Sequence, residues 1–589
     1  MKIYEIKCSD KGEYQDITRF LNDILIECRS IKEEKLILFE KGEYHFYQDF
    51  CTEEIIYASN TDSDKFPVKR IAINIHNIKN LTIDGYGSDF YMHGKIVPVK
   101  VTDSENITLK NFSWDFPSPT VLEMKVITSN CFSAEYSIPE GTMWDIKNGK
   151  LHWFDKSPFT GQFYWEEYND GESYCNVIYD EENSTKCRHS LNVSPFNLAI
   201  KLRKIDNNTV KINYIKKLSK HYKPFNIFEM CSSKRRDCVG SFFAESRNIS
   251  VQNVNVHYMS GFGWLTQMCE NVSFIGCSFS PNPLSDKNCT SFADLIHVSG
   301  AKGKIHIEGC NFSHAHDDPI NIHGTYTRVK KMPNKNTLVL EYVHNQQNGF
   351  AQYHEGDKVI FYNRGNFVSV ENEKEFTVKN ITHPLCGGNS VKEMVVEFYD
   401  ELPDVLMQKQ KHVCENVTYT PEVYIGSCSF NMIPTRGILC TTRRKALIEN
   451  NTFDNHTMAS IYLSNDCNDW YESGPIYDMT IRNNIFNVRK SPVYKGNKGA
   501  ILIDPIVAEK SDDVPVVHHN ITIENNIFNM EHDNVINAAY TDKIIFRNNE
   551  VYSIGNECIS AFALKKCSDV ILNNNFYSVN VNSSADNTK

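Results

Sequence analysis

Short segments in which Ile, Val or Phe alternate with polar residues recur along most of the chain. Equivalent positions lie 23 residues apart between Ser427 and Asn450 and between Asn525 and Asn548, and 33 apart between Asn450 and Asn483. Alternation with a period of two is the pattern of a β-strand, and a repeat of strands at this interval predicts a solenoid. We therefore expect a right-handed parallel β-helix built from the segments NISVQNVNV, NVSFIGCSF, KIHIEGCNF, VYIGSCSF, ALIENNTF, MTIRNNIF, ITIENNIF, IIFRNNEV and VILNNNF.

The turns between these strands hold Asn–Asn pairs at residues 450–451, 483–484, 525–526 and 548–549. Asn accepts left-handed backbone conformations, and its amide can hydrogen-bond to an equivalent amide in the next coil. We therefore expect the pairs to stack from coil to coil. The second position of the same turn is a cysteine in earlier coils, which we interpret as a small packed residue rather than a metal ligand: Cys277, Cys310 and Cys428.

Two stretches depart from the repeat and are rich in strand-like segments. Residues 117–235 contain GKLHWFDKS and TVKINYIKKL, and residues 325–420 contain TLVLEYV, DKVIFYN and EMVVEFYD. We expect two inserted β-barrel-like modules, the second placed to form one wall of a site. The chain then divides into an N-terminal cap with the first coils (1–116), the first insertion (117–235), central coils (236–324), the second insertion (325–420) and C-terminal coils (421–589).

Residues 14–28 predict a short helix that caps the open end of the solenoid, where edge strands would otherwise be exposed. Ile17, Phe20, Leu21 and Ile24 follow helical spacing in this segment and define its apolar face.

Composition excludes several classes of function. The 589 residues carry a formal net charge of −11, so no basic surface for nucleic acid is expected. No apolar run is long enough to span a membrane, and the first residues, MKIYEIKCSDKGEY, lack a secretory pattern. The 19 cysteines include no CxxC pair, which argues against a disulfide scaffold or a zinc cluster. We expect a cytoplasmic protein, or a secreted or periplasmic one if a leader was removed.

Three carboxylates are predicted to share one part of the surface. Asp294 and Asp318 each stand six residues before a glycine, with a strand-like segment between. Aligning the next coil places Arg436 in the same column, and Asp317 lies beside Asp318. Carboxylates this close repel one another, so we expect a raised pKa for at least one of them.

Such a column offers the chemistry of a glycosidase, which needs one protonated and one ionised carboxyl group. Carboxyl groups on neighbouring coils leave room for a water molecule between them, as an inverting enzyme requires. Calcium binding is a competing use of the same atoms, and Asp pairs in other proteins often only cap turns.

Several polar residues around the column are candidates for substrate binding. Asn321 and His323 alternate with isoleucines and should point away from the core. Arg436 either neutralises the acids or binds sugar hydroxyls, and each histidine is as compatible with a structural role. The loop NDCNDWYESGP combines an aromatic ring with an acid, which suits a sugar face and its hydroxyl groups. The candidate binding residues are His297, His316, Asn321, His323, Arg436, Trp470 and Glu472.

The ordered segments LTIDGYGSDFYMHG, ADLIHVSG, HAHDDPINIHG, PTRGILCTTRRK and WYESGP resemble glycoside hydrolase family 110, nearly end to end. Its members are exo-acting α-1,3-galactosidases that remove terminal galactose from blood group B and linear α-1,3-galactosyl glycans. The resemblance implies a β-helix with barrel-like insertions, the catalytic acids Asp294, Asp317 and Asp318, an inverting mechanism, and no metal or other cofactor. The implied partner is a galactose-terminated oligosaccharide or glycoconjugate, and a homodimer stays open.

We favour Asp294 as the acid and the Asp317–Asp318 pair as the base, although the sequence alone does not settle these roles. Alternatives remain open on the same scaffold: a polygalacturonase-like hydrolase, a calcium-dependent polysaccharide lyase, or a glycan-binding β-helix without catalysis. A polygalacturonase-like enzyme should carry a GHG turn, whereas the turn here is NIHG.

Overall fold

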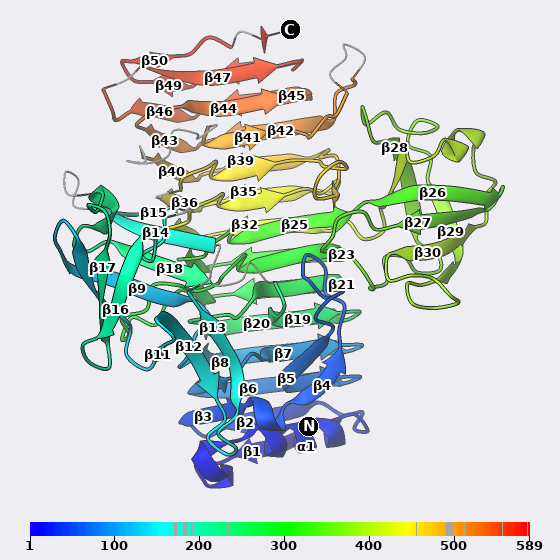
Figure 1. Cartoon of the computed structure of the whole chain (residues 1–589). Coiled ribbons are helices and arrows are strands. Elements are labelled where there is room, and N and C mark those ends of the chain that lie inside the picture. The colour runs from blue at the N-terminus through cyan, green and yellow to red at the C-terminus, as the bar shows by residue number, and fades with distance from the viewer. Residues whose placement is uncertain are drawn as a thin grey trace.

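The long axis of the molecule is a stack of β-strand coils, seen in a computed structural model of the chain (Figure 1). One sheet system of 35 strands runs through the stack. The parallel β-helix expected from the repeat is confirmed by the parallel pairing of each coil with the next. The structure describes residues 1–169, 173–180, 185–189, 193–231, 236–454, 456–489, 499–509, 514–556, 558–585 and 587–588.

Each C-terminal coil contributes one strand to each of three parallel stacks. The first stack contains β35 (Ala446–Glu449), β39 (Met479–Arg482), β42 (His518–Glu524) and β45 (Thr541–Arg547). The second contains β36 (Thr452–Asp454), β40 (Ile485–Val488), β43 (Ile527–Met530) and β46 (Glu550–Ser553). The third contains β37 (Ile461–Leu463), β41 (Ile501–Ile503), β44 (Asn534–Ala539) and β47 (Ile559–Lys565).

The core between the stacks is filled by the alternating apolar side chains. Phe430, Phe453, Phe486 and Phe528 stack ring upon ring, with centroids 4.8, 4.9 and 4.7 Å apart. This distance matches the spacing of paired strands, about 4.8 Å, so equivalent side chains of successive coils are in van der Waals contact. Cys277, Cys310 and Cys428 are buried in the same interior, as expected, and the cysteines whose side chains are described are free thiols.

In each Asn–Asn pair, the first residue adopts the turn conformation of the backbone and the second forms side-chain hydrogen bonds. The first residue of each pair, at 450, 483, 525 and 548, has a positive φ of 54 to 58°. The second residue forms a ladder in which each amide nitrogen donates to the amide oxygen of the next coil, at 3.0 to 3.3 Å. The ladder runs through Asn451, Asn484, Asn526, Asn549 and Asn575, and it confirms the predicted stacking.

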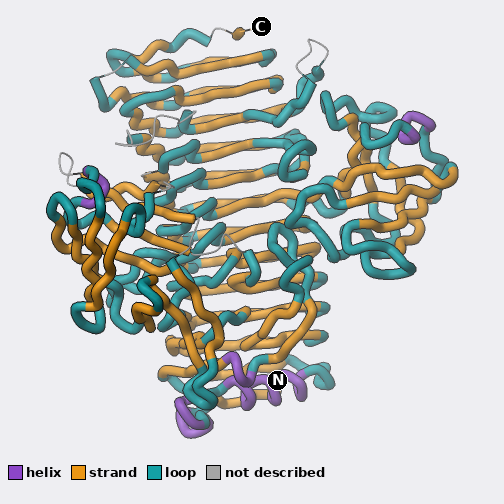
Figure 2. Tube along the Cα trace, viewed as in Figure 1, coloured by secondary structure: helices purple, strands orange, loops and turns teal. Residues whose placement is uncertain are grey.

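Among the residues that the structure describes, helices are confined to a few short segments, and helix α1 lies at the N-terminal end of the stack (Figure 2). Helix α1 (Thr18–Cys28) confirms the predicted cap but starts later than expected, because a 3₁₀ turn (Glu13–Gln15) precedes it. Its buried face is Leu21, Leu25 and Cys28, whereas Phe20 is 40% exposed.

Two antiparallel modules project from the coils on opposite sides (Figure 1). The first contains a seven-stranded sheet and a three-stranded sheet. The seven strands are β9 (Leu122–Ser129), β10 (Ser133–Ser137), β14 (Ser173–Asp180), β15 (Thr185–His189), β16 (Ala199–Lys204), β17 (Thr209–Tyr214) and β18 (Ile227–Cys231), and the three are β11 (Met143–Lys147), β12 (Lys150–Lys156) and β13 (Phe163–Tyr168).

The second module is a closed six-stranded barrel with its own apolar core. Its strands are β26 (Thr327–Asn334), β27 (Thr337–Glu341), β28 (Lys358–Asn363), β29 (Phe376–Thr382), β30 (Glu393–Phe398) and β31 (His412–Asn416).

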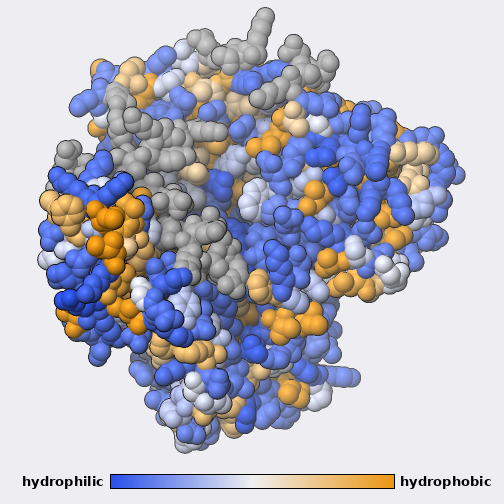
Figure 3. Space-filling view, in the orientation of Figure 1, coloured by the Kyte–Doolittle hydropathy of each residue, from blue (hydrophilic) through white to orange (hydrophobic). Residues whose placement is uncertain are grey.

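The visible surface is mostly hydrophilic, with hydrophobic residues gathered on part of the first module (Figure 3). Ile200, on β16, is 64% exposed, and Ile205 and Ile215, at the ends of β16 and β17, are 49% and 63% exposed. Within the described residues no helix is both long and apolar enough to cross a membrane.

Candidate active site

The predicted column of Asp294, Asp318 and Arg436 is present. Strands β23 (Ile296–Glu308), β25 (Ile320–Thr325) and β34 (Ile438–Cys440) lie side by side, with their first residues in register. Each column residue stands two positions before its strand, so parallel register stacks the three side chains. Asp317 precedes Asp318 and lies at the same edge.

A cavity of about 230 Å³ opens over this column. All three predicted catalytic acids line it, together with five of the seven predicted binding residues: His297, Asn321, Arg436, Trp470 and Glu472. The remaining two, His316 and His323, do not line it.

Two arginines hold the Asp317–Asp318 pair. Arg436 donates from Nε and Nη2 to the two carboxylate oxygens of Asp318, at 3.0 and 2.6 Å. Arg236 donates to Asp317 Oδ2 at 2.9 Å. The Asp318 side chain is 2% exposed and that of Asp317 is 28% exposed. Asp318 is therefore bound on both oxygens, whereas Asp317 keeps access to the cavity.

Two of the acids, Asp294 and Asp317, have raised pKa values. Burial raises the pKa of Asp294 to about 7; the charges of Arg236 and Arg436 lower this pKa, and those of Asp318 and Glu472 raise it. Burial, followed by Asp294 and Asp318, also raises the pKa of Asp317 to about 7. The expected raised pKa values are thus found, and they arise mainly from loss of solvent around the charged form.

Asn321 offers a free acceptor to a ligand. Its side chain is 6% exposed, and its Oδ1 finds no hydrogen-bond partner among the described residues. A buried amide oxygen without a partner is unfavourable by about 1–3 kcal/mol. A hydroxyl group in the cavity would satisfy it.

His323 points away from the core, as alternation predicted, but it is covered. Strand β38 (Glu472–Ser473) folds over it and pairs antiparallel with β25. The ring of His323 therefore lies behind His297, with the two Nε2 atoms 2.8 Å apart. His323 contacts two residues that line the cavity, His297 and Glu472.

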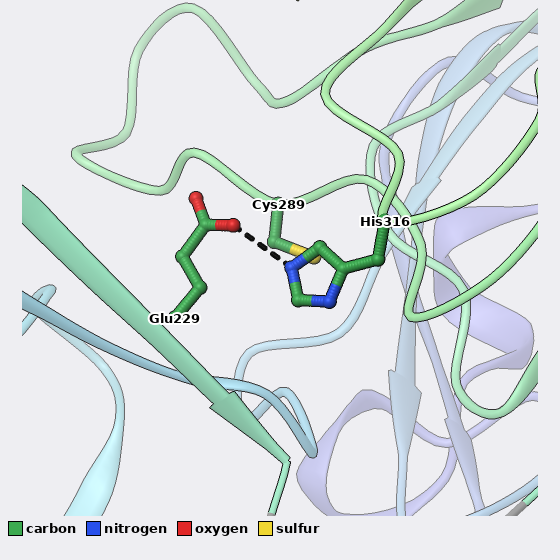
Figure 4. Close-up of side chains that lie close together, drawn as sticks. All are labelled: Glu229, Cys289 and His316. Carbon is green, nitrogen blue, oxygen red and sulfur yellow. Dashed lines mark hydrogen bonds and ion pairs between the residues drawn. The ribbon is translucent and has the colours of Figure 1, made fainter. Parts of the chain in front are cut away.

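The ring of His316 points to Glu229 of the first module (Figure 4), and His316 does not line the cavity. Its Nε2 lies 2.8 Å from Glu229 Oε2, on β18, and Arg188 on β15 is paired with the same oxygen. His316 lies in a turn, where strand alternation does not set the side-chain direction, and the contact with Glu229 decides it. Its position does not support the expected contact with substrate. The residue instead joins the inserted sheet to the loop that carries Asp317.

The Trp470 loop forms the rim of the cavity. Asp466 fixes the loop by accepting the backbone N–H groups of residues 468, 469 and 470 at 2.7 to 2.9 Å. The Trp470 ring is 41% exposed and lies 4.4 Å from His344 in the second module and 5.6 Å from the Arg236 guanidinium. The barrel thus supports one wall of the site.

Several residues that line the cavity were not predicted from the sequence, notably Asn60, Arg236 and Tyr462. Asn60 and Arg236 lie outside the aligned repeat, so no register could place them. Tyr462 is in register with Leu439, which is in register with Asn321, so extending the row of the outward-facing Asn321 by two coils would have found it.

In the described part of the chain, two groups of side chains have donor atoms close enough for a metal ion, namely His297 with His323 and Glu472, and Glu229 with Cys289 and His316. In the first group the imidazole nitrogens are hydrogen-bonded to each other. In the second group the Arg188 cation already pairs with Glu229. A further cation there would be repelled.

No protein-family profile matches the chain. Among curated proteins, the α-1,3-galactosidase A of Bacteroides thetaiotaomicron is 34% identical over 531 residues, covering 88% of this chain and 86% of that protein. The α-1,3-galactosidase A of Streptomyces avermitilis is 32% identical over 547 residues (91% and 85%). The α-1,3-galactosidase B of Bacteroides fragilis is 30% identical over 561 residues (93% and 90%). Among solved structures, the Agl-KA catalytic domain has a TM-score of 0.42 at 9% identity, covering 99% of this chain and 68% of that chain.

Proposed function

The chain belongs to the α-1,3-galactosidases of glycoside hydrolase family 110, and from this premise we propose that it is an inverting exo-glycosidase. Its substrates are glycans that end in α-1,3-linked galactose, of the blood group B type, the linear type or both. The observation that carries the proposal is the cavity in which Asp294 and Asp317, with raised pKa values, face the Arg436-bound Asp318.

The hydrolysis assigns one role to each carboxyl group. Asp294 donates its proton to the glycosidic oxygen as the bond from that oxygen to the anomeric carbon breaks. A water molecule attacks the opposite face of this carbon, and Asp317 accepts the proton of the water. Asp318 is bound on both oxygens by Arg436, so it orients the pair and balances the positive charge that develops on the sugar. The product is β-galactose.

The size and lining of the cavity favour a single terminal sugar. About 230 Å³ is below the ~300–1,000 Å³ typical of pockets that enclose drug-sized ligands. The free Oδ1 of Asn321 accepts one hydroxyl group, and the exposed ring of Trp470 offers a face for sugar C–H groups at the rim. Both features suit an exo-acting enzyme.

The test is incubation with a linear and a fucosylated branched α-1,3-galactosyl oligosaccharide, followed by proton NMR during the first turnovers. We expect free galactose that appears first as the β anomer. Initial α-galactose would contradict inversion. An unsaturated product that absorbs in the ultraviolet would indicate a lyase, and retention of the glycan without release of sugar would indicate a binding protein.

A further inference from the structure

A chain of short hydrogen bonds runs from Asp294 into the protein, behind the cavity. His297 Nδ1 lies 2.7 Å from Asp294 Oδ2, and His297 Nε2 lies 2.8 Å from His323 Nε2. His323 Nδ1 lies 2.7 Å from the carbonyl oxygen of Gly324. Asp294 is 3% exposed and both rings are 1% exposed, so the chain ends inside the protein.

The carbonyl end of this chain fixes the positions of the protons. A carbonyl oxygen only accepts, so His323 Nδ1 must carry a proton. Only one proton can lie between the two Nε2 atoms, and only one between His297 Nδ1 and Asp294 Oδ2. Three protons can therefore occupy these hydrogen bonds in two arrangements that keep His297 neutral, as its burial favours, and the two interconvert when two protons shift by one hydrogen bond.

In the first arrangement His323 is an imidazolium, His297 donates to Asp294, and Oδ2 of Asp294 carries no proton. In the second, both rings are neutral and Oδ2 carries the proton. Glu472 Oε1 lies 3.4 Å from His323 Nε2 and is the nearby counter-charge for the imidazolium of the first arrangement. Asn60 donates to the same Glu472 oxygen at 3.1 Å and holds it in place.

Other charges also face Asp294. Arg236 lowers its pKa, as does Arg436, whereas Asp318 and Glu472 raise it. Burial of an unpaired Asp294 carboxylate would be strongly unfavourable. An acid in this position therefore needs a way to give up a proton without becoming an isolated anion.

We propose that His297 and His323 are positioning residues that pass a proton to Oδ2 of Asp294 while Oδ1 of the same carboxyl group protonates the leaving oxygen. The inference rests on the proposed hydrolase function. Three protons move in the same direction: from Oδ1 to the leaving oxygen, from His297 Nδ1 to Oδ2, and from His323 Nε2 to His297 Nε2. In total, one proton leaves this set of hydrogen-bonded groups. Asp294 stays a neutral acid, His323 becomes neutral, and the negative charge of Glu472 is then no longer balanced by His323. A solvent proton restores the first arrangement after product release.

The test uses two variants that keep a hydrogen bond but cannot pass a proton. In His297→Asn the amide reaches Asp294, and in His323→Gln the amide reaches His297. Turnover is measured on an α-1,3-galactobiose, whose leaving oxygen needs a proton, and on α-galactosyl fluoride, which needs far less assistance. We expect kcat on the disaccharide to fall at least about 10-fold, a part of the ~10²–10⁴ typical of general acid catalysis. Turnover of the fluoride should change less than about 3-fold.

The matched control is His518→Gln, a fully buried histidine on β42 outside the site. It should affect both substrates equally or not at all. An equal loss on both substrates in the His297 and His323 variants would assign them a purely structural role and overturn the relay, and so would unchanged turnover of the disaccharide. If one of the two variants fails to fold, the comparison of the two substrates in the other variant still tests the relay.

A measurement without turnover separates the relay from the proposed function. In substrate-free protein labelled with ¹⁵N-histidine, the ring shifts of His297 and His323 should change together near pH 7, the pKa of Asp294. The change should be absent in Asp294→Asn. Rings that titrate independently of Asp294 would overturn the relay, whereas absence of galactose release by the unaltered protein would contradict only the proposed function.

Discussion

Replacing Asp294 by Asn should raise stability above neutral pH while it abolishes most of the activity. The Asn amide has the shape of the carboxyl group and can donate to His297 Nδ1, so the hydrogen bond observed there is retained. The proton needed by the leaving oxygen is lost. We expect turnover to fall by about 10²–10⁴ on a disaccharide.

The sign of the stability change follows from the raised pKa of Asp294. In the unfolded chain this carboxyl ionises near its ordinary value of 3.8, whereas in the folded protein it holds its proton up to about pH 7. Between these values the folded state binds more protons than the unfolded state, so the contribution of Asp294 to stability decreases as pH rises. Above pH 7 the contribution of Asp294 to stability stays at its lowest value. One pKa unit corresponds to about 1.4 kcal/mol, so Asn recovers up to about 4 kcal/mol there.

The assay is calorimetric melting of the protein and of Asp294→Asn at pH 4 and at pH 8, at one scan rate. The two melting temperatures should agree at pH 4, and the variant should melt several degrees higher at pH 8. Asp454→Asn, on β36 outside the column, is the control and should leave the rate of hydrolysis nearly unchanged. A variant that is less stable at pH 8, or a difference that does not depend on pH, would refute the assignment of a strained buried acid.

Three further outcomes are expected. Asp317→Asn and Asp318→Asn should each lower kcat by about 10²–10⁴ with folding intact, as seen by circular dichroism, and near-normal turnover in either variant would remove its assigned role. Exhaustive chelation of divalent metals should leave the rate of galactose release almost unchanged, whereas a loss that calcium restores would favour a lyase-like site. Arg436→Met should lower the free energy of unfolding in urea by about 3–5 kcal/mol, because it leaves Asp318 buried without its partner; equal stability would mean that solvent reaches Asp318.

The column of acids could be predicted because the repeat fixes register. Counting positions from one turn to the next gives the order of strands in a stack, and parallel pairing then brings Asp294, Asp318 and Arg436 together. The Asn ladder follows from the same counting. Both predictions depend only on local periodicity, which the sequence displays directly.

The parts that escaped prediction depend on contacts between distant segments. Alternation gave the outward direction of His323 but not the strand β38 that covers it. His316 lies in a turn and takes its direction from Glu229, 87 residues away. Arg236 follows an insertion, where no repeat gives a register. Such placements are decided by how inserted modules pack on the coils, and no spacing within a repeat encodes that.

The Asn ladder makes the coil an indivisible unit of length. Asn526 and Asn549 are 23 residues apart, and each donates its amide to the next rung. Removing residues 526–548 would join Asn525 directly to Asn549 and restore an Asn–Asn turn that meets Asn484, so the ladder loses one rung and stays continuous. Removing one residue more or fewer would reverse the faces of the strand that follows. The solenoid can therefore be lengthened or shortened only by whole coils. The distance from the catalytic column to the C-terminal end changes by one coil spacing for each coil added or removed.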